Sequence, residues 1–433
     1  MRKQVIMGIG AASLAVVGAG VAFFLQVDRD SASRRVCSDG ALTVAAVGDI
    51  MMGTDIAPAE RVAGETRNQL RASNATIGSL DMTLLDKPEV AEINSPVGGT
   101  QTARLLRQWG FSAFARANTR ANDFELAGLE QTDKILRDNK LISAGAGADL
   151  AAARAPGLIS TACGAVALIS VATSSRDLDP NPALPSRAGI AGRPGISALH
   201  YTTRTKVDAA TYAKLRDGSA QIGGPPPEKD GTLNAFGMIV ELGESNSTTT
   251  VVNADDQAGV LAAIKEARKT AALVVVSLYS GEYGDSVDAP AALAEDFARA
   301  AIDAGAGLVI GHGSHSLRPV EFHNGGLIAY SLGDFIADRR LGAGHVADSP
   351  DATPAPLDVA APEGAILSTS FRDGRVISAR LTALNLAATQ GFPRLSDTAE
   401  VLSHIADGSA ARGAKFNIQK GSADIVAAVA PSP

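Results

Sequence analysis

The segment GDIMMG at residues 48–53 and the segment GHGSH at residues 311–315 each follow an apolar run of strand length. Glycine lets a backbone turn sharply at the end of a strand. The side chains carried by these two turns are a carboxylate, Asp49, and two imidazoles, His312 and His315. Oxygen and nitrogen donors of this kind bind divalent cations when they converge. The two segments therefore predict a metal-type site built at the ends of distant strands.

Apolar runs and helix-compatible stretches alternate around these segments. The predicted strands cover residues 42–47, 75–85, 111–115, 273–278 and 308–310, and the predicted helices cover residues 60–74, 103–110, 125–139, 255–269 and 291–304. Two hairpins are expected at residues 320–331 and 365–381, the first around an Asn-Gly pair that suits a type I′ turn. This order predicts a mixed α/β system of sheets with added antiparallel strands.

Composition divides the chain into four stretches. We expect residues 1–27 to hold a cytoplasmic stub with an apolar anchor or signal segment, and residues 28–40 to be a polar tether. Residues 41–390 form the main domain, within which residues 174–231 are insertion-like and rich in Pro, Gly and Arg. The run GGPPP in that region cannot be a regular element. Residues 391–433 are expected to add one helix, at residues 398–406, and a disordered end.

Charge and aromatic content exclude some classes of function. The 433 residues carry a net charge of −7 and no block of Lys or Arg, which disfavours nucleic-acid binding. Only 4% of residues are aromatic, so any platform for stacking sugars would be small. The sequence contains neither a Gly-x-Ser-x-Gly elbow nor the Gly-Lys-Ser/Thr ending of a P-loop.

The N-terminus carries an uncharged run of 21 residues, residues 5–25, preceded by Arg2 and Lys3. At about 1.5 Å per residue, a helix of this length spans a hydrocarbon layer of about 30 Å. The small residues at 20–22 leave a cleaved secretory signal open as the alternative to an uncleaved anchor. Either way the basic residues stay inside and the rest is exported. We therefore expect a single-pass protein of the cell membrane, with its main domain outside the cytoplasm.

The chain has two cysteines, Cys37 and Cys163. In an exported domain they can form one disulfide, which would tie the start of the first strand to the strand-like segment that follows Cys163. Two separate buried thiols are the alternative that the sequence leaves open. Neither cysteine has a nearby His or Asn, so neither is expected to be a nucleophile.

The order of several segments resembles the CapA family of poly-γ-glutamate and capsule-synthesis proteins. The similar segments lie at residues 48–51, 117–129, 145–147, 193–195, 304–306, 311–315 and 330–335. The resemblance implies an α/β fold of the metallophosphatase type, a four-layer α/β/β/α sandwich, preceded here by one N-terminal transmembrane helix. It also implies an exported domain that helps to make or export an envelope polymer.

The resemblance implies a reduced set of metal ligands. Asp49 stands where the family has its first aspartate, and His312 and His315 stand at its paired histidines. Asp86 lies near the family's Asn-Leu-Glu-x-Pro motif, where the Asn is missing and Glu is shortened to Asp. Three or four such ligands suffice for one zinc or manganese ion, but hardly for two. One divalent cation, or none, is therefore expected.

Other family positions carry residues that cannot replace the missing imidazoles. Arg120, in the segment that begins with Asn118, stands where the family has a histidine, and Tyr279 stands where a further histidine follows a strand, close to Glu282. Arginine stays protonated and cannot ligate a metal, but its donor fork suits phosphate or carboxylate. We therefore expect Arg120 to replace the charge of one metal, with Asn118, Glu282 and Tyr279 lining the same anion-binding cleft.

These observations favour an exported, membrane-anchored CapA-like protein that acts in the synthesis or export of poly-γ-glutamate or an anionic polysaccharide. Its degenerate metal site would be weakly catalytic or non-catalytic. Its partners would be the anionic polymer or its precursor, the membrane and capsule-synthesis proteins. One alternative is an active metal-dependent phosphoesterase with a reduced ligand set. Another is a structural assembly partner that makes its contacts through residues 174–231.

Overall fold

The structure is a computed structural model that describes residues 37, 40–62, 64–86, 95–175, 182–244, 246–338 and 363–427. These residues belong to one compact unit, which spans residues 35–433. The predicted anchor at residues 5–25 lies outside the described residues. Within the described ranges, no helix is both long enough and apolar enough to cross a membrane.

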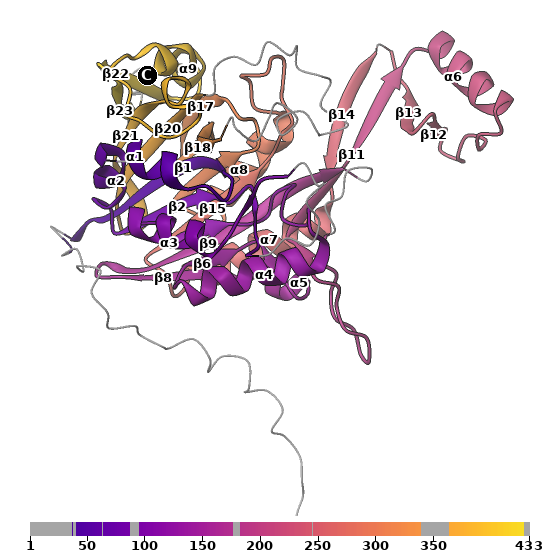
Figure 1. The fold of residues 1–433 in the computed structure, drawn as a ribbon. Helices are drawn as coiled ribbons and strands as arrows, with labels where there is room; N and C mark the ends of the chain where they lie inside the picture. Colours follow the sequence, from indigo (N-terminus) through magenta and orange to yellow (C-terminus); the bar gives the residue numbers. More distant parts are fainter. Residues whose placement is uncertain are drawn as a thin grey trace, which may run out of the picture. The chain divides into compact units, whose positions relative to one another are not determined.

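Nine of the described strands form the first sheet (Figure 1). They are β1 (Leu42–Met51), β2 (Ala75–Ser79), β5 (Ala113–Ala115), β6 (Ile142–Ala144), β19 (Asp334–Ala337), β20 (Glu363–Arg372), β21 (Arg375–Asn385), β22 (Ala414–Gln419) and β23 (Ser422–Ala427). The order is β22-β23-β21-β20-β1-β2-β5-β6, with β19 paired to β1. β1, β2, β5 and β6 run parallel, and the strands on the β20 side run antiparallel.

Ten of the described strands form the second sheet. They are β8 (Gly157–Thr161), β9 (Gly164–Ser175), β11 (Ala198–Val207), β12 (Leu233–Ala235), β13 (Met238–Leu242), β14 (Ser247–Val252), β15 (Leu273–Tyr279), β16 (Leu308–His312), β17 (Leu317–His323) and β18 (Gly326–Leu332). The order is β12-β13-β11-β9-β15-β16-β18-β17, with β14 beside β11 and β8 beside β9. Its centre, β9 to β18, is parallel. Two small pairs complete the strands: β3 (Thr83–Leu84) with β4 (Val97–Gly98), and β7 (Ala146–Gly147) with β10 (Gly195–Ile196).

Alternation along the central strands packs the two sheets face to face. In β1, Val44 and Ala46 belong to the core shared by both sheets, whereas Ala45 and Val47 point to the other face of their sheet. In β15, Val275 likewise points to the shared core. Successive side chains of a strand point to opposite faces, so strands that are apolar at every position are buried on both sides.

Helices cover the outer face of each sheet. α3 (Thr100–Trp109) and α4 (Glu125–Asp138) pack on the nine-stranded sheet, and α7 (Ala254–Arg268) and α8 (Ala292–Asp303) pack on the ten-stranded sheet. The remaining described helices are α1 (Ala57–Val62), α2 (Gly64–Leu70), α5 (Leu150–Arg154), α6 (Ala209–Gln221), α9 (Glu400–Ala410) and a 3₁₀ turn at Ala387–Thr389. The prediction of an α/β sandwich, with two sheets between layers of helices, is confirmed.

The insertion-like region at residues 174–231 contains regular elements that its composition did not predict. β11 and α6 lie within it, and Figure 1 shows β11 and β14 extending together toward α6, β12 and β13. This extension has its own small core, which includes Val207, Tyr212 and Val240. Because the core is small, α6 needs few apolar positions, and its sequence gives a weak helical pattern. The GGPPP run itself carries no regular element.

The prediction of a disordered end is wrong through residue 427. After α9, strands β22 and β23 form a hairpin that pairs with β21 and so extends the nine-stranded sheet. Their alternation buries Ala423 and Ile425 on the core side. Lys420, with φ of 52°, and Gly421 make the turn. The strands are short and half polar, as is usual when only one face is buried.

Cys37 and Cys163 form a disulfide, with their Cα atoms 5.2 Å apart. Of the two alternatives that the sequence left open, the structure therefore supports the bonded one. The bond joins the residues just before β1 to the turn between β8 and β9, across 126 residues of sequence. Closing a loop of this length restricts the unfolded chain and stabilises the fold.

Candidate metal centre

The two sheets meet at the carboxyl ends of their parallel strands. His312 ends β16 and Tyr279 ends β15 in one sheet, whereas Asp49 lies near the end of β1 and Asp81 follows β2 in the other. Side chains from the two sheets contact each other here, since His312 approaches Asp49 and Tyr279 approaches Asp81. In α/β sheets this edge is the usual place for ligand sites, because loops of several strands converge there.

The structure brings together three of the four predicted metal ligands. His312 Nδ1 lies 3.3 Å from Asp49 Oδ1, and His315 Nδ1 lies 3.9 Å from Asp49 Oδ2. The backbone N–H of Gly313 donates to Asp49 Oδ2 at 2.9 Å. Asp49 is fully buried and His312 is nearly so. Their role as ligands remains a prediction, but their convergence is a property of the fold.

Glycines at the strand ends allow this close approach. A Cβ atom on Gly48 would lie 1.9 Å from the carbonyl oxygen of Gly333, and one on Gly311 would lie 1.9 Å from that of Tyr330. These two glycines therefore serve tight backbone packing inside strands. The turn itself comes later, at Gly313, whose φ is +92°. His315 also adopts a left-handed φ of 55°, a conformation that is uncommon for residues with a side chain.

Asp86, the fourth predicted ligand, lies outside this cluster. Its exposed carboxylate accepts hydrogen bonds from the backbone N–H and the hydroxyl of Thr100, both at 2.6 Å, at the start of α3. These bonds hold the pKa of Asp86 below its usual value. The chain leaves the cluster after β2, because β3 pairs with β4 and carries Asp86 to α3.

Asp81 takes the place that the sequence assigned to Asp86. One donor atom each from Asp49, Asp81 and His315 lie within 4.8 Å of one another. Asp81 is fully buried, and sequence reasoning missed it because the resemblance pointed to the later motif at Asp86. A local signal was present, since Asp81 is the first carboxylate after the buried strand β2.

The cluster fits a cation, because several of its buried polar atoms form no hydrogen bond. Among the described residues, these atoms are Oδ1 of Asp49, Oδ1 of Asp81 and both ring nitrogens of His312. Asp49 Oδ1 and His312 Nδ1 face each other as an ion pair at 3.3 Å. Unpartnered buried polar atoms are rare in folded proteins and carry a desolvation penalty of about 1–3 kcal/mol each. Carboxylate oxygens with imidazole nitrogens form a donor set suited to manganese or zinc. We therefore assign Asp49, Asp81 and His315, with His312 adjacent, as the candidate metal centre.

Burial and neighbouring charges shift the pKa values of the titratable groups at the centre in different directions. Burial, and then the charge of Asp49, raise the pKa of Asp81 to about 7. Burial alone would also raise the pKa of Asp49, but the adjacent His312 and His315 outweigh it, and the pKa is lowered. Burial opposes protonation of His315, yet its pair with Asp334 dominates and raises its pKa to about 10. The group thus favours an added positive charge beside Asp49 and Asp81.

The segment after β5 lines one side of the centre. Asn118 is fully buried, donates to the carbonyl of Leu80 at 2.8 Å and accepts from the backbone N–H of Arg120 at 3.1 Å. Arg120 lies 3.4 Å from Asp123, and its positive charge partly offsets the rise in the pKa of Asp81. Arg120 therefore acts electrostatically on the centre, whereas Asn118 fixes the backbone beside it.

Tyr279 contacts the centre directly and Glu282 does not. The Tyr279 hydroxyl lies 3.4 Å from Asp81 Oδ2 and 3.1 Å from the Thr119 hydroxyl. The Glu282 carboxylate accepts from the hydroxyls of Thr173, at 2.7 Å, and Ser280, at 2.6 Å. These bonds occupy Glu282 in shaping the loop after β15, and its part in an anion cleft remains a prediction.

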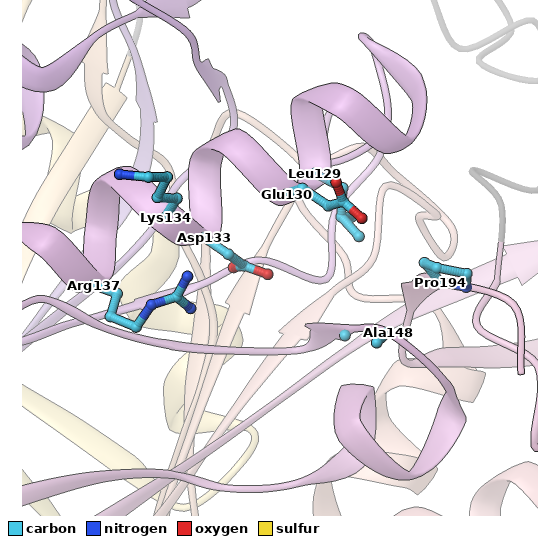
Figure 2. A pocket seen from close by; sticks show the side chains of 8 residues that line it. Leu129, Glu130, Asp133, Lys134, Arg137, Ala148 and Pro194 are labelled. Atoms are coloured by element: carbon cyan, nitrogen blue, oxygen red, sulfur yellow. The ribbon is translucent and has the colours of Figure 1, made fainter. Parts of the chain in front are cut away.

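A separate hollow lies beside α4 (Figure 2). It has a volume of about 380 Å³ and is lined by Leu129, Glu130, Asp133, Lys134, Arg137, Gly147, Ala148 and Pro194. None of the residues of the candidate metal centre lines it. The polar face of α4 provides its charged side chains, two acidic and two basic, as in an ordinary solvated helix surface.

Comparison with known proteins gives the family. The profile of the family described as "Bacterial capsule synthesis protein PGA_cap" matches residues 43–339, a range that includes every residue of the candidate centre. The chain belongs to this family. The match confirms the resemblance to CapA proteins that the strand-end segments suggested. It also makes a part in capsule synthesis the family-level context for the site.

Individual relatives in the PGA_cap family are distant. An uncharacterized protein of Sinorhizobium fredii is 30% identical over 313 residues, which cover 68% of this chain and 66% of that protein. The "PGA biosynthesis protein CapA" of Bacillus subtilis is 24% identical over 311 residues, 70% of this chain and 65% of the relative. A "probable polyglutamine synthesis accessory protein" of Mycobacterium tuberculosis is 28% identical over 53% of this chain and 46% of its own length. The chain thus spans less than two thirds of each of these relatives.

Proposed function

We propose that this PGA_cap family protein binds an anionic envelope polymer, or its precursor, at a centre that holds one divalent cation. The observation that carries the proposal is the buried pair Asp49 and Asp81, which lie beside His315 and each have an oxygen that accepts no hydrogen bond. Such a centre is short of positive charge, so it attracts a cation first and, through that cation, an anionic group. The metallophosphatase-like class of the sandwich is part of this proposal.

The protein's own side chains divide the work between cation and anion. Asp49, Asp81 and His315 would hold manganese or zinc, with His312 as a further donor. Once bound, the ion would supply Lewis-acid polarisation of a phosphoryl or carboxyl oxygen. Arg120 supplies a fixed positive charge on the Asp81 side, where its donor fork suits a carboxylate or phosphate.

Weak catalysis, or none, follows from the small ligand set. A two-metal hydrolase clamps the attacking and leaving oxygens between ions about 3.5–4 Å apart. At the candidate centre, Tyr279 fills space next to Asp81, and its ring packs where a side chain at Gly313 would be. A phenol that is buried in this way keeps its proton, because burial, and then the charge of Asp81, raise the pKa of Tyr279.

An active phosphoesterase is the second candidate, and His312 favours it. Both of its ring nitrogens are buried without a hydrogen-bond partner among the described residues, as expected of a side chain that awaits a metal. If His312 joins the ligands, the centre could activate a water molecule on a phosphate ester. The two functions differ in metal stoichiometry and in turnover, so both can be measured on one preparation.

The test uses the full chain, purified with its native metal. Elemental analysis should find one equivalent of manganese or zinc, and binding of poly-γ-glutamate should weaken about tenfold in Arg120→Gln. Lys134→Gln, at the hollow beside α4, is the matched control and should bind as the wild type does. Two tightly bound equivalents with turnover of a generic phosphate ester would establish the phosphoesterase instead. A protein that binds neither metal nor polyanion would overturn both.

We further propose that the main domain works outside the cytoplasm, anchored by residues 5–25. The Cys37–Cys163 disulfide supports this location, because such bonds persist in oxidising compartments. A reporter fusion at the C-terminus should be active only when export is intact, and membrane fractionation should separate an anchored chain from a cleaved one. Reporter activity confined to the cytoplasm would contradict the proposal.

A further inference from the structure

Asp334 lies at the point where the chain passes from one sheet to the other. β18 belongs to the ten-stranded sheet and β19 pairs with β1 of the nine-stranded sheet, so the crossing takes the single residue Gly333. In the β1–β19 register, Asp334 lies opposite Asp49. A residue in this position is placed at the candidate centre by the topology of the fold, although 285 residues of sequence separate it from Asp49.

The backbone around Asp334 is held tightly. The N–H of Asp49 donates to the carbonyl of Gly333 at 3.0 Å, a contact that leaves no room for a side chain at Gly48. Gly333 has a φ of +62°, and a Cβ atom there would lie 2.1 Å from the carbonyl oxygen of Glu363. Neighbours on both sides therefore fix the direction in which the Asp334 side chain leaves the backbone.

The carboxylate of Asp334 is used by His315 alone among the described contacts. Its Oδ1 lies 2.8 Å from His315 Nδ1, and the side chain of Asp334 is 5% exposed. The same nitrogen lies 3.9 Å from Asp49 Oδ2, so the bond to Asp334 fixes the orientation of the ring beside Asp49. Carboxylate–histidine pairs of this kind orient metal-binding histidines and make them more basic.

We propose that Asp334 is a positioning residue that orients His315 toward the cation of the candidate centre. Asp334 acts through His315 and does not belong to the donor set of Asp49, Asp81 and His315. The left-handed backbone of His315 fits this role, because a strained residue needs a second anchor to keep its ring in place. This inference rests on the proposed function, since it requires a cation at the centre.

Calorimetric titration of the metal-free full chain with Mn²⁺ tests the proposal. Asp334→Asn keeps the shape of the side chain and should weaken Mn²⁺ binding about 10–100-fold. Asp338→Asn is the matched control, because Asp338 is equally buried and lies four residues along, but binds the N–H of Gly53. It should leave the affinity unchanged within about twofold. Asp334→Glu, which keeps the charge, should recover part of the lost affinity.

A double-mutant cycle separates positioning from general destabilisation. If Asp334 acts only through His315, then Asp334→Asn in the background of His315→Asn should cause no further loss of affinity. Thermal unfolding of each variant with a chelator shows whether it is folded. Equal affinities for wild type, Asp334→Asn and Asp334→Glu would overturn the inference and leave the metal centre intact. Absence of Mn²⁺ binding by the wild type would instead overturn the proposed centre, and Asp334 with it.

Discussion

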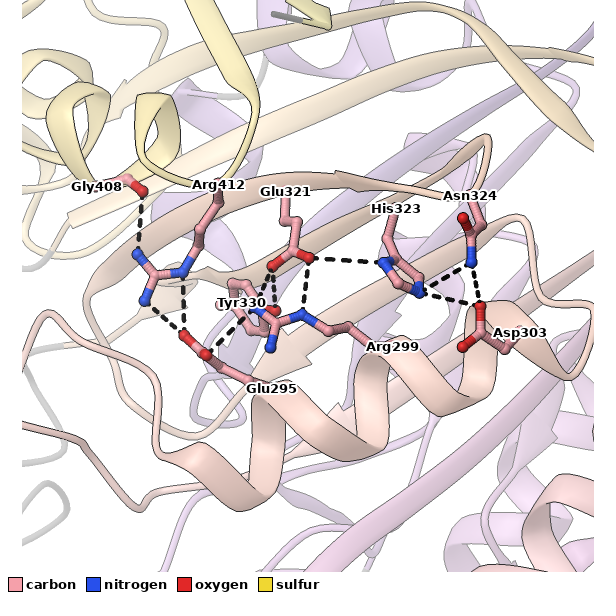
Figure 3. Close-up of polar contacts among 9 residues, drawn as sticks. All are labelled: Glu295, Arg299, Asp303, Glu321, His323, Asn324, Tyr330, Gly408 and Arg412. Carbon is pink, nitrogen blue, oxygen red and sulfur yellow. Dashed lines mark hydrogen bonds and ion pairs between the residues drawn. The ribbon is translucent and has the colours of Figure 1, made fainter. Parts of the chain in front are cut away.

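The candidate metal centre and the group of charged side chains around α8 contain similar residue types. Only in the group around α8 do the polar side chains satisfy one another with hydrogen bonds and ion pairs. The α8 network consists of Glu295, Arg299, Asp303, Glu321, His323, Asn324, Tyr330 and Arg412 (Figure 3). Glu321 accepts both nitrogens of the Arg299 fork, at 2.8 and 2.9 Å, and the Tyr330 hydroxyl at 2.7 Å. Glu295 binds Arg412 at 2.5 and 3.0 Å.

In the α8 network each acidic group faces a cation or a polar hydrogen. Burial would raise the pKa of Glu321, but its bonds to Arg299 and Tyr330 outweigh burial and the pKa is lowered. At the metal centre, by contrast, one oxygen of Asp81 forms no hydrogen bond, and burial and the charge of Asp49 raise its pKa to about 7. Ion pairs such as that of Glu321 tie α8 to β17, β18 and the segment after α9. A buried charge without such a pair, like that of Asp81, destabilises the fold unless a ligand compensates it.

Among substitutions in the two clusters, the largest effect is expected at Asp49. Asp49→Asn removes the one carboxylate of the centre that approaches both His312, at 3.3 Å, and His315, at 3.9 Å, so it should weaken Mn²⁺ binding by about 100-fold or more. Calorimetric titration measures the change. Glu321→Gln, a carboxylate of the α8 network, is the control and should bind Mn²⁺ as the wild type does. Equal losses in the two variants would mean that the clusters do not differ in the way described.

Breaking the α8 network should cost stability instead. Glu321→Ala leaves the hydroxyl of Tyr330 without its partner and Arg299 with only Glu295, 3.4 Å away, which should reduce the free energy of unfolding by about 3 kcal/mol. The value lies at the low end for buried pairs because a third of the Arg299 side chain is exposed. Urea unfolding measures it. A loss below about 1 kcal/mol would show that the network contributes little.

Asp81→Asn should increase the free energy of unfolding, in contrast to Glu321→Ala. The folded pKa of Asp81, about 7, lies above its ordinary value of 3.8, so Asp81 destabilises the folded state progressively as pH rises from about 4 to 7. Asn does not titrate, and in chelator the variant should therefore be more stable than wild type by about 1–3 kcal/mol at pH 8. The difference should vanish near pH 4. Unfolding curves at both pH values provide the measurement, and equal stability at pH 8 would contradict the unpaired state of the centre.

The smallest effect is expected at the surface. Lys134 pairs with Asp138 one turn along α4, with 65% and 55% of the two side chains exposed. Lys134→Ala should change the free energy of unfolding by no more than about 0.5 kcal/mol, because water and salt screen such pairs. Unfolding in urea at low and high salt checks this. A larger loss would point to a role for the hollow that Lys134 lines.

Residues at strand ends were predicted to converge, and the structure brings them together. Asp86, which was predicted from a family motif between strands, lies outside the cluster. Asp49, His312 and His315 were predictable because each follows an apolar run that had to be a buried strand. Asp86 was assigned from its likeness to a family motif, but the short strand β3 turns the chain toward α3 before that residue. Five residues earlier, Asp81 stands at the strand end, where the same reasoning that located Asp49 would have placed it.

By itself, the sequence determined a mixed α/β system of sheets, because strands apolar on both faces need cover on both sides and the intervening helices supply it. It also determined that a carboxylate and two imidazoles leave the strand ends, since their glycines and apolar runs are local features. Only the tertiary structure decided that these side chains meet and that Asp334 joins them. Its place depends on the crossing between the two sheets, which is set by packing between segments that lie hundreds of residues apart.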